Sequence, residues 1–445
     1  MGGGGQGVYA LDVTSVPNNT TSELDIADKV LWEFTDADDS DLGYTFSKPV
    51  IVRLHNGRWA AIFGNGYNNT EADSNTSTTG NAVLYIVDIE NGATGSSSVI
   101  KIDTMEGMAD DPLSQNRPNG LASVTAADID GDYIVDYVYG GDLFGNMWKF
   151  DLTASNSSNW GVAYGSSSNP TPLFQAVRSG YHQPITTKPS IRRHPTGDGF
   201  VVMFGTGKYL ESGDAVASTN VESVYGVWDR DEKSGGGSPI LTSFNRSHLL
   251  EQEIILETTA PVSDVRVVTD TPIQWHSGSG LPSGGSGDYL GWYLDLIVSG
   301  QGPEGEIQIT DSVVRDELFL FTTFIPNDNP CSDGGESWLW AIDFASGSRA
   351  DHKVFEIDGA AGSGGTNDTV NVPSGGPAFV SAVKKQGLVE MSDPAVTPDR
   401  DFRIYLNPDD FDPEGGNHPD CQGEDCEDLE GDPTQVNRQS WRQLR

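Results

Sequence analysis

The sequence predicts an all-β protein, and three observations carry this prediction. Short runs rich in Val, Ile, Tyr, Phe and Trp recur along the chain of 445 residues. Clusters of Gly, Asn, Asp and Ser separate these runs, which is the pattern of strands joined by turns. Glycine reaches 53 residues, whereas long apolar stretches with helical periodicity are missing. A chain of this length forms either a few average domains or one large repeat fold.

A strand that ends in Asp is the repeating unit. An aromatic or aliphatic run precedes Asp in six places, and the clearest copy is residues 338–343. The aspartates that end the six runs are Asp12, Asp88, Asp151, Asp229, Asp295 and Asp343. A second strand-like element lies upstream of several copies, as at 48–52 and 188–191, and a third ends in Gly, as at 62–66 and 203–207. Each repeat therefore offers several short strands, with Gly where backbones approach closely.

The length of the repeats indicates how the strands assemble. Successive aspartates of the unit are 76, 63, 78, 66 and 48 residues apart. All-strand repeats of this size are typical of a β-propeller, so we expect one modified β-propeller of about seven blades, with loop insertions, over residues 1–445. Residues 375–445 would form the seventh blade, and residues 7–14 would supply its closing strand. A pair of β-sandwiches is the alternative, and the recurring unit argues against it. Tryptophans at the repeat ends are expected to pack between blades: Trp148, Trp228, Trp292, Trp338 and Trp340.

The formal net charge of −39, from 65 acidic and 26 basic residues, restricts the partners of the chain. Such a surface repels nucleic acid and anionic membranes and attracts cations. No apolar run of about 18 residues is present, so we expect no membrane span. Segment 408–433 is acidic and is interpreted as a loop-like tail within the domain. Because a glycine run after Met1 leads directly into a strand, we expect the chain to be cut from a longer precursor.

Residue types that often act in catalysis do not form a recognisable motif. The seven histidines are scattered, and no nucleophile elbow, phosphate-binding loop or dinucleotide fingerprint is present. The three cysteines are Cys331, Cys421 and Cys426, and the sequence does not determine which of them pair. His418 lies near two of them, but a zinc site there would lack a fourth ligand. We therefore expect no catalytic residues and no enzymatic activity.

An acidic loop at residues 128–136 gives the strongest functional signal. Asp128, Asp130, Asp132 and Asp136 occupy positions 1, 3, 5 and 9 of this loop, and Ile134 occupies position 7. Acids at alternate positions of a tight loop direct carboxylates toward one centre, and Ca²⁺ prefers roughly six to eight hard oxygen ligands. The backbone carbonyl of Ile134 would add a further oxygen. The sequence therefore predicts a calcium site here.

Two other interpretations of acidic loops bear on this prediction. The loop is not an EF-hand, because Tyr133 and Tyr139 stand where that motif requires Gly and Glu. Residues 136–140 have the pattern of a strand, so we expect the loop to join two strands. The alternative is a solvated acidic turn, since Asp and Gly favour turns. A second acidic run, at residues 36–41, lacks the alternate spacing and is interpreted as such a turn.

Segments 119–122, 128–136 and 139–152 together resemble the C-terminal domain of the PilC/PilY family, the type IV pilus tip-associated adhesins and biogenesis factors. The resemblance covers almost the whole chain. Further segments that carry it are 42–49, 183–189, 204–210, 330–339 and 440–444.

The resemblance implies a calcium-binding propeller that is the C-terminal domain of a longer secreted protein. This domain would take part in pilus biogenesis and in attachment at the pilus tip. The calcium loop of the family maps onto Asp128, Asp130, Asp132 and Asp136, with Ile134 at the carbonyl position. In the family, calcium occupancy is linked to pilus extension and retraction. The partners implied are minor pilins at the pilus tip and a host or surface ligand. The location implied is the cell surface, after passage through the periplasm and the outer membrane.

Two features limit what the resemblance carries over, and two rival functions stay open. Some members contain an Arg-Gly-Asp sequence that engages integrin, and this chain contains none. The variable N-terminal half of the family is also missing. A quinoprotein-like propeller dehydrogenase is one rival, although the vicinal Cys-Cys pair that many such enzymes use is absent. A carbohydrate-binding surface propeller is the other.

Overall fold

Strands make up almost all the regular structure of the computed structural model. It describes residues 5–14, 27, 29–72, 74–92, 98–215, 218–230, 233–234, 238–239, 244–260, 263–278, 280–282, 287–327, 335–355, 357, 369–373, 375–386, 388–389, 395–396, 402–405 and 426–429. Helix is almost absent from these residues, and the 3₁₀ turns are η2 (Met108–Asp110), η3 (Ser157–Asn159), η4 (Ser212–Ala215) and η5 (Arg246–His248). The prediction of an all-β fold is therefore confirmed.

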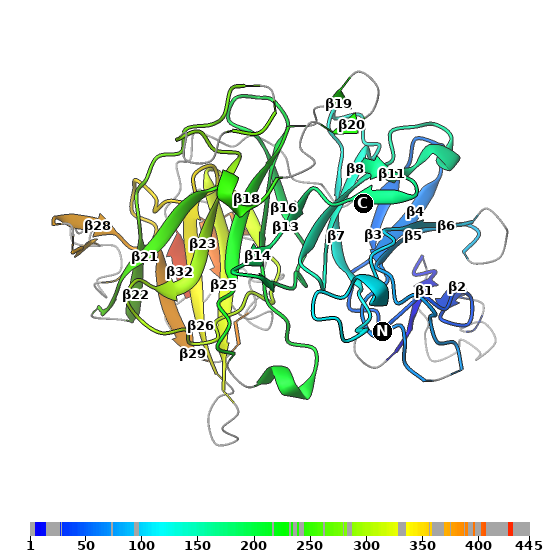
Figure 1. Ribbon diagram of the computed structural model, residues 1–445, viewed down its shortest axis with the longest axis horizontal. Helices are drawn as coiled ribbons and strands as arrows, with labels where there is room; N and C mark the ends of the chain where they lie inside the picture. The colour runs from blue at the N-terminus through cyan, green and yellow to red at the C-terminus, as the bar shows by residue number, and fades with distance from the viewer. Residues whose placement is uncertain are drawn as a thin grey trace.

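The first part of the chain forms three small antiparallel sheets. The first sheet pairs β1 (Gly7–Leu11) with β2 (Val30–Thr35). The second has the order β3 (Val50–Arg53), β4 (Trp59–Gly64), β5 (Val83–Asp88) and β6 (Val99–Asp103). The third has the order β10 (Gly161–Val162), β9 (Asn146–Asp151), β8 (Tyr137–Asp142) and β7 (Leu121–Ala127), and β13 (Phe174–Gln175) also pairs with β9. In Figure 1 these sheets lie on the blue and cyan side of the molecule.

One ten-stranded sheet occupies the other side of the molecule (Figure 1). Its strands, in order across the sheet, are β16 (Ser190–Arg193), β17 (Phe200–Gly205), β18 (Ser223–Asp229), β23 (Gly291–Val298), β21 (Leu250–Thr259), β22 (Asp264–Val268), β29 (Ala382–Gln386), β26 (Gly335–Asp343), β25 (Leu318–Pro326) and β24 (Val313–Arg315). All neighbours are antiparallel except β21 and β23, which run parallel. The strands β21 and β22 thus join two four-stranded groups, which are β16–β18 with β23 and β24–β26 with β29.

Short strands make up the remaining sheets. Four two-stranded pairs are β11 (Tyr164–Ser166) with β12 (Asn169–Thr171), β14 (Val177–Arg178) with β15 (Tyr181–His182), β19 (Lys233–Ser234) with β20 (Ser238–Pro239), and β27 (Thr369–Asn371) with β28 (Pro377–Phe379). A three-stranded sheet has the order β30 (Ala395–Val396), β31 (Phe402–Tyr405) and β32 (Cys426–Leu429).

Apolar cores lie between consecutive sheets, and the alternation along each strand explains why. In β5, Tyr85 packs in the core shared with β1 and β2, whereas Ile86 packs in the core shared with β7 and β9. In β17, Phe204 faces the core shared with β8, and Met203 faces the core shared with β23 and β26. Successive residues of a strand point to opposite faces, so each inner sheet contributes to two cores. Independent sandwiches would not share cores in this way.

The recurring aspartates have a physical role at the strand ends. The six predicted runs are the strands β1, β5, β9, β18, β23 and β26. In four of the units the Asp side chain accepts a backbone N–H from the turn that follows, which stabilises the turn. The donors are Thr14 to Asp12, Glu90 to Asp88, Thr153 to Asp151 and Ser346 to Asp343, at 2.7–3.0 Å.

The other two recurring aspartates connect different parts of the fold. Asp229 on β18 binds the Nζ of the buried Lys149 on β9 at 2.8 Å, which joins two sheets. Asp295 binds Arg178 at 2.9 Å and Arg246, and β23 continues past this aspartate to Val298. The same residue type at the same place in the repeat therefore serves either a turn or a contact between elements.

The expected glycine and tryptophan contacts are confirmed. A Cβ on Gly64, at the end of β4, would lie 2.3 Å from the backbone oxygen of Ala122 in β7, so only Gly permits this approach. The five repeat tryptophans are at most 4% exposed and pack in the inter-sheet cores.

The second half of the chain differs from the expectation of separate blades. The two four-stranded groups form one sheet because β21 and β22 lie between them, and β21 pairs with β23 while β22 pairs with β29. Strands occur where the seventh blade was expected, but β29 joins β26, whereas β28 and β31 belong to other sheets. The expected latch onto residues 7–14 is not among the described pairings, where β1 pairs with β2. The count of seven blades and the latch stay predictions.

Several sequence predictions fall outside the described residues. Cys331, Cys421 and the segment 440–444 lie there. So does the tail 408–433, apart from the four residues of β32. Cys426 lies in β32, of which only the backbone is described. The pairing of the cysteines therefore stays open.

Candidate metal centre

The acidic loop connects two adjacent antiparallel strands. Residues 128–136 join β7 to β8, whose facing ends pair Ala127 with Tyr137. The Asp136 amide donates to the Ala127 carbonyl at 2.9 Å and closes the hairpin. The prediction of a strand-to-strand connection is confirmed.

The carboxylates of the loop fold the backbone around themselves. Asp128 accepts hydrogen bonds from the amides of Gly131 at 2.7 Å and Tyr133 at 2.8 Å. Asp136 accepts one from the Ile129 amide at 2.8 Å. Gly131 and Tyr133 have φ angles of +81° and +68°, which turn the chain back toward Asp128. The left-handed conformation is costly for Tyr, so the surrounding hydrogen bonds must offset it.

Three of the four predicted acids come together. Asp128, Asp130 and Asp136 can each present a carboxylate oxygen so that these oxygens lie within 4.8 Å of one another. Asp136 is buried at the base of the group, Asp128 is half-buried and Asp130 is exposed. One side of the group therefore faces solvent, from which a cation can enter.

Asp132 lies outside this group of three. Its Oδ1 accepts the amide of Ile134 at 2.8 Å, so this carboxylate supports the turn. Ile134 is half-buried beside it. The roles of the Asp132 carboxylate and the Ile134 carbonyl as metal ligands stay predictions.

Residues from both neighbouring sheets hold the loop in place. His55, in the turn after β3, has its Nε2 2.9 Å from Asp136 Oδ1. The Val135 amide donates to the Arg53 carbonyl at 3.0 Å. On the other side, Arg193 of β16 donates to the Ile129 carbonyl at 3.0 Å. Sequence reasoning missed His55 as part of this site, because 81 residues separate it from Asp136.

The donor set fits a hard cation. Three carboxylates and nearby backbone oxygens are the ligands that Ca²⁺ takes, whereas zinc prefers nitrogen and sulfur donors. The other acidic run contrasts with this loop. Asp39 and Asp41 both bind the Nζ of Lys101, at 2.8 Å and 2.5 Å, so a side chain already offsets one of their two charges. This pairing agrees with the interpretation of that run as a turn.

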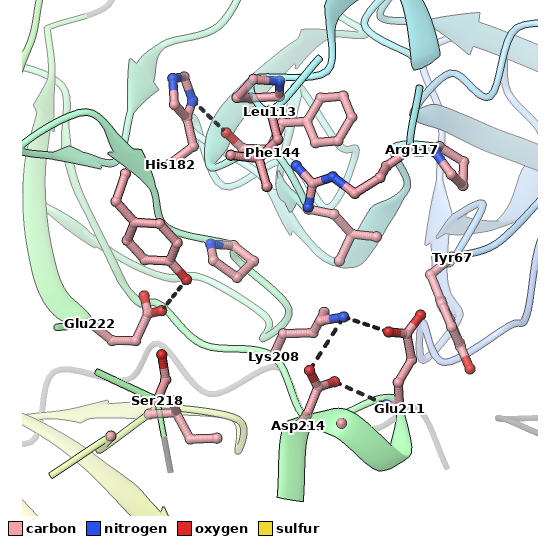
Figure 2. A pocket seen from close by; sticks show the side chains of 18 of the residues that line it. Tyr67, Leu113, Arg117, Phe144, His182, Lys208, Glu211, Asp214, Ser218 and Glu222 are labelled. Carbon is pink, nitrogen blue, oxygen red and sulfur yellow. Dashed lines mark hydrogen bonds and ion pairs between the residues drawn. The ribbon is translucent and has the colours of Figure 1, made fainter. Parts of the chain in front are cut away.

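A pocket of about 560 Å³ lies apart from the loop (Figure 2). Phe144, from the β8–β9 turn, and Tyr67 line it, as do Lys208 and Glu211, which follow β17. Glu222, directly before β18, also lines it. No motif in the sequence indicated this pocket, because its walls come from segments far apart in the chain.

Comparisons with known proteins decide the family. A family model described as the PilY1 beta-propeller domain matches residues 1–263. The chain belongs to the PilY1 family. Two curated relatives in this family are named type IV pilus biogenesis factor PilY1 or its homolog. The Xylella fastidiosa homolog is 38% identical over 390 residues, which cover 86% of this chain and 24% of the relative. The protein of Pseudomonas aeruginosa strain PAO1 is 34% identical over 462 residues, which cover 99% of this chain and 35% of the relative.

A solved PilY1 structure extends the match beyond the residues of the family model. The crystal structure of the Pseudomonas aeruginosa PilY1 C-terminal domain has a TM-score of 0.73 and 30% identity. It covers 97% of this chain and 78% of the solved chain. The prediction of a modified β-propeller and the resemblance to the PilC/PilY family are thus confirmed. The chain spans only about a quarter to a third of the length of the curated PilY1 relatives.

The names of the PilY1 relatives describe biogenesis factors and no enzyme. Among the residues that the structure describes, no helix has the length and apolar character needed to cross a membrane.

Proposed function

We propose that this chain is a calcium-binding domain that acts in type IV pilus biogenesis and attachment at the pilus tip. Calcium would bind Asp128, Asp130 and Asp136, with Asp132 and the Ile134 carbonyl as further ligands. Minor pilins are the proposed partners, and a host or surface ligand is the proposed target. The proposed location is the cell surface, reached through the periplasm and outer membrane. The observation that carries the proposal is the convergence of three carboxylates in a chain of the PilY1 family.

Calcium would control the shape of a surface that spans three sheets. Without a cation, three carboxylates whose oxygens lie within 4.8 Å of one another repel. A bound Ca²⁺ would offset two of their three charges and order the loop. Because the loop contacts Arg53, His55 and Arg193 on the neighbouring sheets, this ordering would extend to both neighbours. A pilus partner that prefers the ordered surface would then be coupled to calcium, which is how pilus extension and retraction would respond to it.

Calorimetry with purified protein tests the calcium site. The wild type should bind one Ca²⁺ in the loop, and Asp136→Ala should bind it at least about a hundredfold more weakly, because its oxygens join the cluster from a buried position. Asp198→Ala is the matched control, since Asp198 is an exposed acid in the β16–β17 turn. Calcium at about a hundred times its dissociation constant should stabilise the wild type by about 2.7 kcal/mol. Equal calcium binding by wild type and Asp136→Ala would refute the site.

A deletion strain tests the role in pili. The complete protein that contains this domain is restored as wild type, Asp136→Ala or Asp198→Ala, and surface pili and twitching distance are measured. We expect Asp136→Ala to change both, and Asp198→Ala to behave as wild type. If Asp136→Ala abolishes calcium binding and leaves pili and twitching unchanged, calcium has no regulatory role here.

A further inference from the structure

The pocket of Figure 2 contains a buried acid, Glu222. Glu222 is 4% exposed and lies on the pocket wall. Its Oε1 accepts the hydroxyl of Tyr181 at 2.8 Å, and its Oε2 accepts the hydroxyl of Thr206 at 2.6 Å. Each carboxylate oxygen has room for a further hydrogen bond, since it carries two acceptor sites. Among the described residues no Lys, Arg or His forms an ion pair with Glu222.

The cations that line the pocket already have partners. Lys208 Nζ lies 3.0 Å from Glu211 and 3.4 Å from Asp214. Arg117 binds Asp111 at 2.6 Å. Neither Lys208 nor Arg117 is therefore available to neutralise Glu222. A buried carboxylate without a cation is costly when ionised, and burial raises the pKa of Glu222 to about 7 although both hydroxyls favour the charged form.

The walls around this acid are about half apolar and half polar. Phe144, Leu113 and Ile307 line the pocket, together with several prolines. A cavity of about 560 Å³ is within the usual range for small-ligand sites. The apolar part of the walls suits a methylene chain, and the buried acid suits a positive head. This combination matches the long side chains of Lys and Arg, whose stems are apolar and whose ends are charged.

We propose that this pocket binds an organic cation, an alkylammonium or guanidinium group, through the carboxylate of Glu222. The cation donates to oxygens that Tyr181 and Thr206 hold in position, while the alkyl stem packs beside Phe144. Such a group belongs either to a Lys or Arg side chain of a protein partner or to a free polyamine. The net charge of −39 favours the approach of either one. The site is separate from the calcium loop.

Calorimetry with small probes tests the pocket and distinguishes the two sources. The probes are N-acetyl-lysine amide, N-acetyl-arginine amide, spermidine and, as the neutral comparison, N-acetyl-norleucine amide. We expect saturable binding of at least one cation and none of the norleucine compound. Tighter binding of an amino-acid amide than of spermidine indicates a protein side chain, and the reverse indicates a polyamine. Absence of saturable binding by every cation refutes the proposal.

Variants assign the binding to Glu222. Glu222→Gln keeps the size of the side chain and removes its charge, so cation affinity should fall at least tenfold. Glu90→Gln is the matched control, since Glu90 is an exposed acid in the turn after β5 and does not line the pocket. Its loss should change the affinity less than threefold. Equal affinity of wild type and Glu222→Gln would overturn the proposal.

A second variant keeps the test valid if Glu222→Gln does not fold. Ser218 is exposed on the same pocket wall as Glu222 (Figure 2). Ser218→Lys would supply a tethered ammonium and compete with the probe, so binding should weaken at least fivefold. Ser218→Gln, of similar length and no charge, should weaken it less. Equal effects of the two substitutions would show that bulk alone blocks the pocket and would overturn the role of charge.

Discussion

The acidic loop and the pocket treat uncompensated negative charge in opposite ways. The loop gathers three carboxylates from nine consecutive residues and exposes one side of the group to solvent. The pocket buries one carboxylate, Glu222, and surrounds it with residues from distant segments. Several close oxygens at the surface suit a small divalent ion, whereas one buried acid in a pocket whose walls are half apolar suits an organic cation. The arrangement of the acids, and not their number in the chain, therefore determines which cation each site would take.

The largest effect we expect is the loss of calcium binding when Asp130 is substituted, compared with the loss when Asp132 is substituted. Asp130→Asn should weaken calcium binding about a hundredfold, because its carboxylate belongs to the group of three. Asp132→Asn should weaken it less than tenfold, since Asn can still accept the hydrogen bond from the Ile134 amide. Calorimetry on both variants gives the ratio of their dissociation constants for calcium. Equal losses would mean that the charge of Asp132 contributes as much to calcium binding as the charge of Asp130.

The pocket should show the next effect, in the pH dependence of stability. The pKa of Glu222 is about 7 in the folded protein and 4.5 as the ordinary value. Between these values the folded state keeps a proton that the unfolded state has lost, so the wild type loses stability as pH rises from about 4.5 to 7. The loss is up to about 3 kcal/mol for this group.

Glu222→Gln does not titrate, so it should gain stability relative to wild type across that pH window. Urea unfolding at pH 4.5 and pH 8 measures the difference, with Glu90→Gln as the control. A constant difference between wild type and Glu222→Gln at both pH values would contradict the raised pKa. An amine probe should reduce the loss at pH 8, because it stabilises the ionised carboxylate.

These two regions also show how far the sequence predicts the molecule. The loop is local, so residue spacing was enough to find it and the strand-to-strand hairpin around it. The strand-Asp unit was equally visible, because in most copies its Asp caps the next turn, as Asp88 does for Glu90. The pocket was invisible, since its walls come from many separate segments. Spacing did not indicate that the Asp132 carboxylate accepts the Ile134 amide, and its role as a ligand stays a prediction.

Long-range pairing explains the remaining differences. No local pattern indicated that β21 would run parallel to β23 and, with β22, join two groups of strands into one sheet. His55 was one of seven scattered histidines until the fold brought it to Asp136. The alternation of apolar residues predicts which faces are buried but not which sheet covers them.

A smaller effect is expected from His55. Its Nε2 lies 2.9 Å from Asp136 Oδ1 and holds this carboxylate in one orientation. Groups that orient metal ligands typically change metal affinity about 10- to 100-fold when removed, so His55→Ala should weaken calcium binding about tenfold. His352→Ala is the control, because His352 lies on an exposed segment beside Asp351. Tighter binding by His55→Ala would mean that His55 competes with the ion.

The smallest effect on calcium is expected from Tyr133, and it separates ion binding from partner binding. The ring is 75% exposed at the tip of the loop, and the backbone has a φ of +68°. Asn tolerates this conformation, so Tyr133→Asn should keep calcium affinity within about twofold and stability within about 0.5 kcal/mol. Exposed aromatic residues are frequent anchors of protein interfaces. If the ordered loop contacts a pilus partner, Tyr133→Asn should reduce twitching although calcium still binds, whereas Asp136→Ala should lose both. Unchanged twitching in Tyr133→Asn would exclude the ring from the contact and would move the partner surface toward the sheets that His55 and Arg193 belong to.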